Sequence, residues 1–233
     1  MDTMPMPGSD TTSTIWVPMC GQSWTNLAAS FLAMWTVMMA AMMLPSSIPV
    51  LWRYRQSVGR AGGLPPAPLT IFAGAGYFMV WTLLGAAIFP LGAVIFAVTT
   101  RYPALARAVP VAVGLIVLAA GALQFTRWKA HHLARCRSGC CHHARGIGRG
   151  SPHDWVCAFC HGLRLGLHCS RCCAGLTAVL LVTGIMDVPV MAAVTAGITL
   201  ERLAPGGERC ARIIGIGVIA AGLILSVRAI GLA

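Results

Sequence analysis

The chain has few charged residues for its length. Only 10% of its 233 residues are Asp, Glu, Lys or Arg, whereas a soluble domain carries roughly 25%. Acidic residues are the scarcest, with 6 Asp and Glu against 17 Lys and Arg. Too few polar side chains are present to cover a surface in contact with water. This composition excludes a soluble globular enzyme.

Five long stretches of the chain contain almost no charge, broken only by Asp187 in the fourth and Arg228 in the fifth. A membrane-spanning helix needs about 20 mainly apolar residues. We therefore predict an all-α integral membrane protein with about five transmembrane helices. Pro90 could split the second stretch into a helix and a re-entrant segment, but one long kinked helix is the simpler expectation. The predicted spans are Leu27–Leu51, Leu69 to about Phe89, Ala108–Phe125, Cys173–Thr199 and Ile213 to the C-terminus.

Lys and Arg in the loops between the spans predict the orientation. Alternating sides place 11 basic residues on one side and 5 on the other, with Arg228 adding one to the first, and the richer side is normally cytoplasmic. The N-terminus is therefore expected outside and the C-terminus in the cytoplasm. No positive n-region precedes the first apolar stretch, so no cleavable signal peptide is predicted. The net charge of +11 is thus a topology signal, and we expect a lipid bilayer and no nucleic acid as partner.

The predicted spans also divide the chain into four parts. Residues 1–26 form a Met-containing extracytoplasmic segment, and 27–126 hold three transmembrane helices. Residues 127–172 form a Cys/His-rich cytoplasmic loop with an amphipathic helix, between the third and fourth spans. Residues 173–233 hold the last two transmembrane helices.

Cysteine and histidine are concentrated in one segment. Residues 131–173 hold 15 of the 17 Cys and His of the chain. Thiolate and imidazole are the ligands of zinc, copper(I) and iron–sulfur centres, so the pattern predicts metal or thiol chemistry more clearly than it identifies a metal. The segment reads His131-His132, Cys136, Cys140-Cys141-His142-His143, His153, Cys157-x-x-Cys160-His161 and His168-Cys169-x-x-Cys172-Cys173.

Metal binding competes with four other interpretations of this segment. Thiol–disulfide exchange is open to Cys169-x-x-Cys172, because a thiolate is favoured at the start of a helix. Structural disulfides are disfavoured, since the inferred cytoplasmic side is reducing. Cys157-x-x-Cys160-His161 matches the attachment motif of c-type haem, which belongs outside the cytoplasm. The fifth interpretation is a basic loop with unused thiols. Metal binding remains the favoured hypothesis.

Helical spacing sharpens the hypothesis. If the chain is helical from about residue 155, then His161, His168 and Cys172 share one face, and Cys169 and Cys173 form an i, i+4 pair beside it. We therefore expect a metal site at the membrane surface that leads into the fourth span. The residues from 131 to 153 are expected to form a flexible loop that collects ions loosely.

Methionines line the first predicted span. Met34, Met38 and Met42 repeat every four residues, and Met39 and Met43 form a neighbouring row. Thioether sulfur is a soft ligand selective for copper(I), although Met also packs adaptably between membrane helices. Further sulfur ligands precede this span, namely Met4, Met6, Met19 and Cys20. Pro45 follows the methionine rows and removes a backbone hydrogen bond, which predicts a kink in the helix.

Asp187 is the one acidic residue inside a predicted span. An acid at that depth costs roughly 2.5–3.5 kcal/mol on insertion scales and usually marks an ion path, a proton relay or a paired contact. A protonated Asp that hydrogen-bonds a neighbouring helix is the alternative. With Met186 and Met191 beside it, an ion path remains a hypothesis.

Three motifs together resemble the bacterial family called domain of unknown function 2182. They are Met38-Met-Ala-Ala-Met-Met-Leu-Pro45-Ser, Gly166-Leu-x-Cys169-x-x-Cys172-Cys173 and Gly184-Ile-Met-Asp187. The resemblance extends from about Trp24 to the last helix and includes Gly76-Tyr77, Val80-Trp81 and Glu201-Arg-Leu-Ala-Pro205. That family is described as predicted metal-binding integral membrane proteins, and some members are labelled copper chaperones.

The resemblance implies metal-binding roles for Cys169, Cys172 and Cys173, with His161 and His168 as companions. The additional cysteines Cys157 and Cys160 depart from what is expected of most relatives. The resemblance therefore implies a site at the end of the Cys/His segment.

We conclude from the sequence that the chain is a bacterial inner-membrane protein that handles or delivers copper(I) rather than catalysing a reaction, with zinc as the other possible ion. A copper-donating or copper-accepting protein is the expected partner. The alternatives are a membrane thiol–disulfide oxidoreductase using Cys169 and Cys172, and a structural zinc or iron–sulfur subunit of a larger complex. In the favoured hypothesis Asp187 compensates the ion's charge. The candidate metal residues are His161, His168, Cys157, Cys160, Cys169, Cys172, Cys173, Met38, Met42, Met43 and Asp187.

Overall fold

The computed structural model describes residues 23–60, 65–138, 152–184 and 187–231, and every element in these ranges is a helix. The prediction of an all-α fold is therefore confirmed. The expectations for Met4, Met6, Met19 and Cys20, and for the run from Cys140 to His143, fall outside the described residues. The helices are α2 (Trp24–Arg60), α3 (Pro66–Arg101), α4 (Pro103–Leu123), α5 (Arg127–Ser138), α6 (Pro152–Thr183), α7 (Val188–Leu203) and α8 (Gly207–Gly231).

Five of these helices are long and apolar enough to span a membrane, which confirms the predicted number. They are α2, α3, α4, α8 and the part of α6 from Asp154 to Thr183. The second of them, α3, is one continuous helix that contains Pro90. This agrees with the simpler of the two expectations, a single long helix.

The fourth membrane-length helix lies earlier in the chain than the predicted span Cys173–Thr199. Helix α6 ends at Thr183, and Gly184 has a φ of +132°, which only glycine adopts without strain. Asp187 then caps α7, because its carboxylate accepts a hydrogen bond of 3.1 Å from the backbone N–H of Val190. Of the segment predicted as a loop with an amphipathic helix, Arg127–Ser138 and the residues from Pro152 onward are helical, and its cysteines from Cys157 to Cys172 lie inside a helix of membrane-spanning length.

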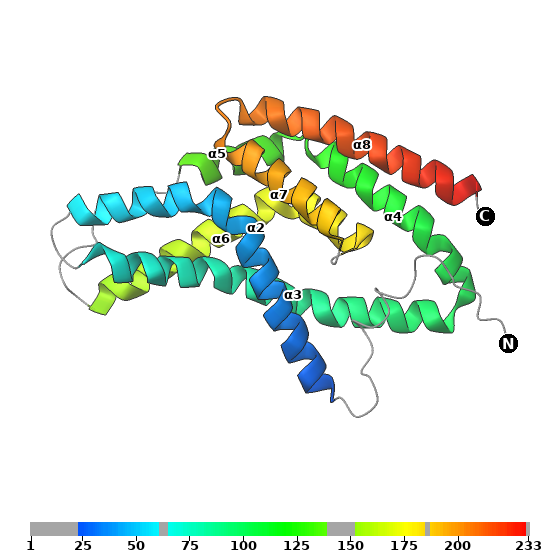
Figure 1. Cartoon of the computed structure of the whole chain (residues 1–233), viewed down its shortest axis with the longest axis horizontal. Coiled ribbons are helices and arrows are strands. Elements are labelled where there is room, and N and C mark those ends of the chain that lie inside the picture. The colour runs from blue at the N-terminus through cyan, green and yellow to red at the C-terminus, as the bar shows by residue number, and fades with distance from the viewer. Residues whose placement is uncertain (1–22, 61–64, 139–151, 185–186, 232–233) are drawn as a thin grey trace.

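Helix α2 changes direction part of the way along its length (Figure 1). Pro45 and Pro49 lie inside the helix and cannot donate backbone hydrogen bonds. Ser46 donates from its hydroxyl to the carbonyl of Met43 at 3.0 Å, and Ser47 donates to that of Leu44 at 3.2 Å. Prolines and serines together account for the bend, as predicted for Pro45.

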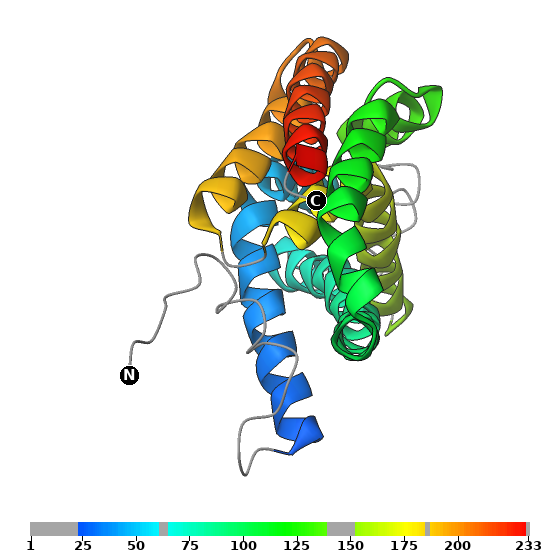
Figure 2. The ribbon, with the colours of Figure 1, turned by 90° about the vertical axis from the view of Figure 1, so that its right-hand side faces the viewer.

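The helices pack as two close pairs that other helices cross. α3 lies along α6 and α4 lies along α8, while α2 crosses α3 and its N-terminal half projects away from the other helices (Figures 1 and 2). At the crossing, the indole N–H of Trp35 donates to the carbonyl of Trp81 at 2.9 Å. Gly76 of α3 and Gly162 of α6 let the two backbones meet, since a Cβ on either would collide with the carbonyl of Phe159 or Ala73 respectively. Small residues at such contacts are typical of membrane helix pairs.

Gly76→Ala should destabilise the α3–α6 pair. Its new methyl group would overlap the backbone of α6, so we expect a loss of about 1–3 kcal/mol and a lower unfolding temperature in detergent. Gly74→Ala is the matched control, because a Cβ at Gly74 meets no atom within 4 Å. Equal unfolding temperatures for the two variants would contradict the close approach of α3 and α6.

Candidate metal centre

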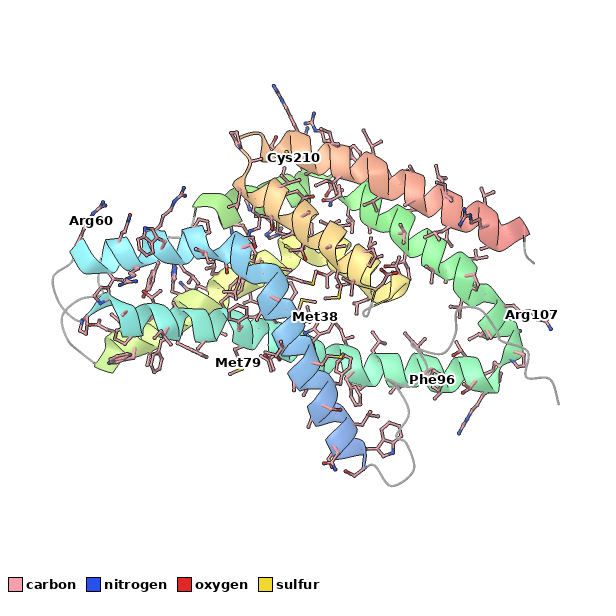
Figure 3. All side chains as sticks on the ribbon, in the orientation of Figure 1. Met38, Arg60, Met79, Phe96, Arg107 and Cys210 are labelled. Atoms are coloured by element: carbon pink, nitrogen blue, oxygen red, sulfur yellow. The ribbon has the colours of Figure 1, made fainter. Side chains whose placement is uncertain are left out.

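Four cysteine side chains from two helices meet inside the bundle. Cys136 comes from α5, and Cys169, Cys172 and Cys173 come from α6, with exposed fractions of 0% for Cys169 and 1% for each of the others. They belong to one buried cluster with four methionines of α2, of which Met38 lies near the place where α2 crosses α3 (Figure 3). These methionines are Met38, Met39, Met42 and Met43. The cluster brings together sulfur atoms from three helices.

The sulfur atoms are close enough to share an ion in pairs. The Sγ atoms of Cys169 and Cys173 are 4.0 Å apart, and Cys172 is hydrogen-bonded to Cys136 and to Cys173. With metal–sulfur bonds of about 2.3 Å, two sulfurs on one ion lie at most about 4.6 Å apart. Among the described residues, no three side chains of His, Cys, Asp or Glu are arranged to hold one ion. The arrangement thus offers pairs of sulfur ligands, whereas structural zinc almost always takes four ligands.

Arg202 of α7 places a positive charge against the cluster. Its Nη1 atom donates to the Sγ atom of Cys169 at 3.3 Å and to the Oγ atom of Ser46 at 2.8 Å, and its side chain is 6% exposed. The hydroxyl of Tyr77 is 3.0 Å from the same Sγ atom. Because donors that point at a sulfur stabilise its negative form, Cys169 is placed to act as a thiolate.

A buried ion pair supports the other side of the cluster. The Nζ atom of Lys129 lies 2.7 Å from the Glu201 carboxylate and donates to the backbone carbonyl of Cys172 at 2.6 Å. Gln124 donates to the second oxygen of Glu201 at 3.0 Å. Burial alone would lower the pKa of Lys129, but Cys172 and Glu201 outweigh it and hold this pKa above its usual value. Lys129 therefore remains charged and fixes α5 against α6 and α7.

The remaining predicted residues lie apart from the four cysteines. His161 is buried and stacks on Tyr54 with ring centroids 4.7 Å apart, about 12 Å before Cys169 along the helix axis. Cys157 packs with a second cluster, and Cys160 is exposed. Asp187, expected to compensate the ion's charge, is an exposed helix cap instead. The reason is the break at Gly184, which moves Asp187 out of the helix interior.

His168 lies beside the cluster and faces His132 of α5, with ring centroids 6.0 Å apart. The expected loose loop from 131 to 153 is therefore wrong for its first part, because residues up to Ser138 belong to α5 and Cys136 is buried. The side-chain hydrogen bond with Cys172 and burial both raise the pKa of Cys136. Burial also lowers the pKa of His132.

The candidate site contains residues that the sequence reasoning did not select. They are Cys136, Tyr77, Arg202 and the pair Lys129 and Glu201. The motifs Gly76-Tyr77 and Glu201-Arg202 had drawn attention as part of the family resemblance, without a role. For Cys136 a local signal exists, because His132-x-x-Arg135-Cys136 repeats the spacing of His168-x-x-Arg171-Cys172.

The fold and the site together define a class: a protein that is helical throughout its described residues, with five helices of membrane-spanning length and a buried cluster of cysteine and methionine sulfur. Comparison with known families gives one match. The family described as PpoB2, copper chaperone, matches residues 32–225. The chain therefore belongs to this copper chaperone family. No curated protein and no solved structure matches the chain.

Removing one member of the buried ion pair should lower the stability of the folded protein more than removing both members. Glu201→Ala would leave the Lys129 ammonium buried without its counter-charge, at a cost of about 3–5 kcal/mol. The double variant Lys129→Met/Glu201→Met should be more stable than Glu201→Ala in thermal unfolding of the detergent-solubilised protein. Glu208→Gln, at an exposed position of α8, is the control and should unfold like the wild type. If the double variant is the less stable of the two, the pair is not what holds α5 and α7 together.

Proposed function

We propose that the chain is a multi-pass protein of the bacterial inner membrane that binds copper(I) in its buried sulfur cluster and delivers it to a partner protein. The observation that supports this proposal is the meeting of four buried cysteines with the methionines of α2 beside Arg202. Soft sulfur ligands select copper(I) over hard cations. Membership of a copper chaperone family supports the same ion. In this proposal, copper is the cargo and not a resident cofactor.

The charges around the cluster favour a monovalent ion. Lys129 and Glu201 neutralise each other, which leaves the guanidinium of Arg202 as the charge to be balanced. Two thiolates and one copper(I) carry a net charge of −1, so they balance Arg202. A divalent ion with two thiolates is neutral and would need a third thiolate for the same balance. Because unbalanced charge is costly inside a protein, the geometry supports copper(I) in preference to zinc.

Burial argues for carriage of an ion in preference to thiol–disulfide exchange. Exchange requires a partner's thiolate to attack a sulfur atom directly. The exposed fractions of Cys169 and Cys172 are 0% and 1%, so a partner protein has no approach to either sulfur. A small ion needs a much smaller opening than a protein does. An oxidoreductase therefore remains the less favoured function.

The loop charges support the proposed orientation, with the N-terminus outside and the C-terminus in the cytoplasm. Met38 and Met42 lie one turn apart on α2, Met43 follows Met42, and all three belong to the sulfur cluster. We propose that they carry the ion between the cluster and the N-terminal half of α2. Thioether ligands are neutral and hold copper(I) less strongly than thiolates do, which suits a route better than a storage site.

Copper(I) titration under anaerobic conditions tests the proposed site. The purified wild type should hold one tightly bound copper(I) in competition with a chelator. Cys169→Ser and Cys173→Ser should each abolish this binding, because each removes one member of the sulfur pair beside Arg202, whose Sγ atoms are 4.0 Å apart. Cys160→Ser is the matched control on the same helix, because Cys160 is exposed, and it should bind as the wild type does. Tight binding of zinc with no bound copper(I) would overturn the proposal.

Arg202 should set the preference for a monovalent ion. Arg202→Gln removes the balancing charge and should weaken copper(I) binding roughly 10- to 100-fold, the range expected when a hydrogen bond to a charged group is lost. Zinc binding should weaken less. Arg202→Lys keeps the charge and should restore part of the preference. If Arg202→Gln weakens copper(I) and zinc binding equally, and Arg202→Lys restores neither, then Arg202 supports only the fold.

A further inference from the structure

Two facing helices carry the same short pattern. On α5 it is His132-x-x-Arg135-Cys136, and on α6 it is His168-x-x-Arg171-Cys172. Each histidine lies four residues before its cysteine, which places the two on one helix face about 6 Å apart along the axis. Cys136 and Cys172 are hydrogen-bonded to each other, and the two imidazoles face each other at a centroid separation of 6.0 Å. The helices therefore present a layer of imidazole next to a layer of thiol.

One ring nitrogen of each imidazole lacks a hydrogen-bond partner. The Nδ1 atoms of His132 and His168 are both buried, and neither has a partner. The side chain of His132 is 8% exposed. A buried polar atom left unpaired costs free energy. A ligand bound by both Nδ1 atoms would remove that cost for both histidines.

The spacing of the rings fits one ion between them. Metal–nitrogen bonds are about 2.0–2.1 Å long, and the centre of an imidazole ring lies about 1.2 Å beyond its nitrogen. Two rings on opposite sides of one ion therefore have centroids at most about 6.5 Å apart, and the observed 6.0 Å is within this limit. Two ligands are sufficient for copper(I) and insufficient for a structural zinc site.

The surroundings connect this pair to solvent and to the sulfur cluster. His131 is exposed, and its ring centroid is 5.7 Å from that of His132. On the inner side, Cys172 follows one helical turn after His168. Arg135 and Arg171 are exposed beside the pair, and two added positive charges disfavour a divalent ion more than a monovalent one. The pair thus lies between an exposed histidine and the buried thiols.

We propose that His132 and His168 form a second, two-ligand site for copper(I), through which the buried cysteines are loaded. This inference rests on the proposed function. In the loading step the copper keeps its +1 charge, two copper–nitrogen bonds break, and two copper–sulfur bonds form. Each thiol that becomes a ligand loses its proton to solvent, and the two imidazoles are neutral both while they bind the ion and after they release it. No oxidant or reductant is needed.

The test is an anaerobic titration of the full-length protein in detergent with copper(I) held by a chromophoric chelator. The wild type should bind two copper(I) ions with different affinities. His132→Gln/His168→Gln should lose the weaker ion, keep the tighter one and take up the tighter one more slowly. Either single substitution should cause the same loss, because one ligand cannot maintain a two-ligand site. Ser170→Ala is the control on α6, because the Ser170 hydroxyl donates only to the carbonyl of Leu167 in its own helix, and it should behave as the wild type does.

The outcomes separate the two proposals. Loss of the tight ion in Cys169→Ser with the weak ion retained supports both. If the wild type binds no tight copper(I), the proposed function fails, whatever the histidine variants do. If the double-histidine variant binds and loads two ions as the wild type does, or the wild type binds only one, the histidine site is overturned. X-ray absorption of copper bound to a variant with all four cluster cysteines replaced by serine should show nitrogen ligands only. Should that variant not fold, the titration of the histidine variants decides alone.

Discussion

A guanidinium carries its charge at every pH that a protein meets, so a buried Arg202 obliges its neighbours to supply acceptors. Two of them are the Oγ atom of Ser46 and the Sγ atom of Cys169, at 2.8 and 3.3 Å from the Nη1 atom. They come from α2 and α6, so one side chain of α7 ties three helices together. The Nη2 atom has no partner, which leaves one more donor directed into the interior. The buried positive charge therefore ties together the helices that meet here and lies against one particular sulfur atom, that of Cys169.

Two interruptions of regular helix make that contact possible. Prolines at positions 45 and 49 bend α2, and Ser46 lies at the bend. The break at Gly184, with its φ of +132°, ends α6 and lets α7 begin in a new direction. If the chain were one straight helix from Cys169 to Arg202, as the predicted span Cys173–Thr199 implies, these two residues would be more than 40 Å apart, at a rise of about 1.5 Å per residue. The break returns Arg202 to within hydrogen-bond distance, and Asp187 stabilises the new helix start as its cap.

The sequence was sufficient for the features that depend on composition and local spacing. Uncharged stretches predicted the helical class and the number of membrane-length helices, and Pro45 predicted the bend. Cys169, Cys172 and Cys173 were selected from their spacing, and they do lie together.

The contributions of Tyr77, Arg202, Lys129 and Glu201 could not be derived in this way. They come from helices distant in sequence and depend on how α3, α5 and α7 pack on α6. Asp187 differs from its predicted position, because an acid expected in the middle of the fourth span caps the N-terminus of α7 after the break at Gly184.

The proposed order of ligands, histidines first and cysteines second, has a consequence for the direction in which copper(I) moves. Imidazole is a borderline ligand and thiolate a soft one, so a copper(I) ion on His132 and His168 gains free energy when it moves to the cysteines. The same difference prevents the histidines from drawing the ion back out. Release therefore requires either an acceptor with thiolates of its own or a weakening of the buried site. Arg202 offers the second route, because it contacts Cys169 and the bent part of α2 at once. A movement of α2 that displaces Ser46 would change the donors around the thiolate, and it would shift the methionines of the same helix in the same motion.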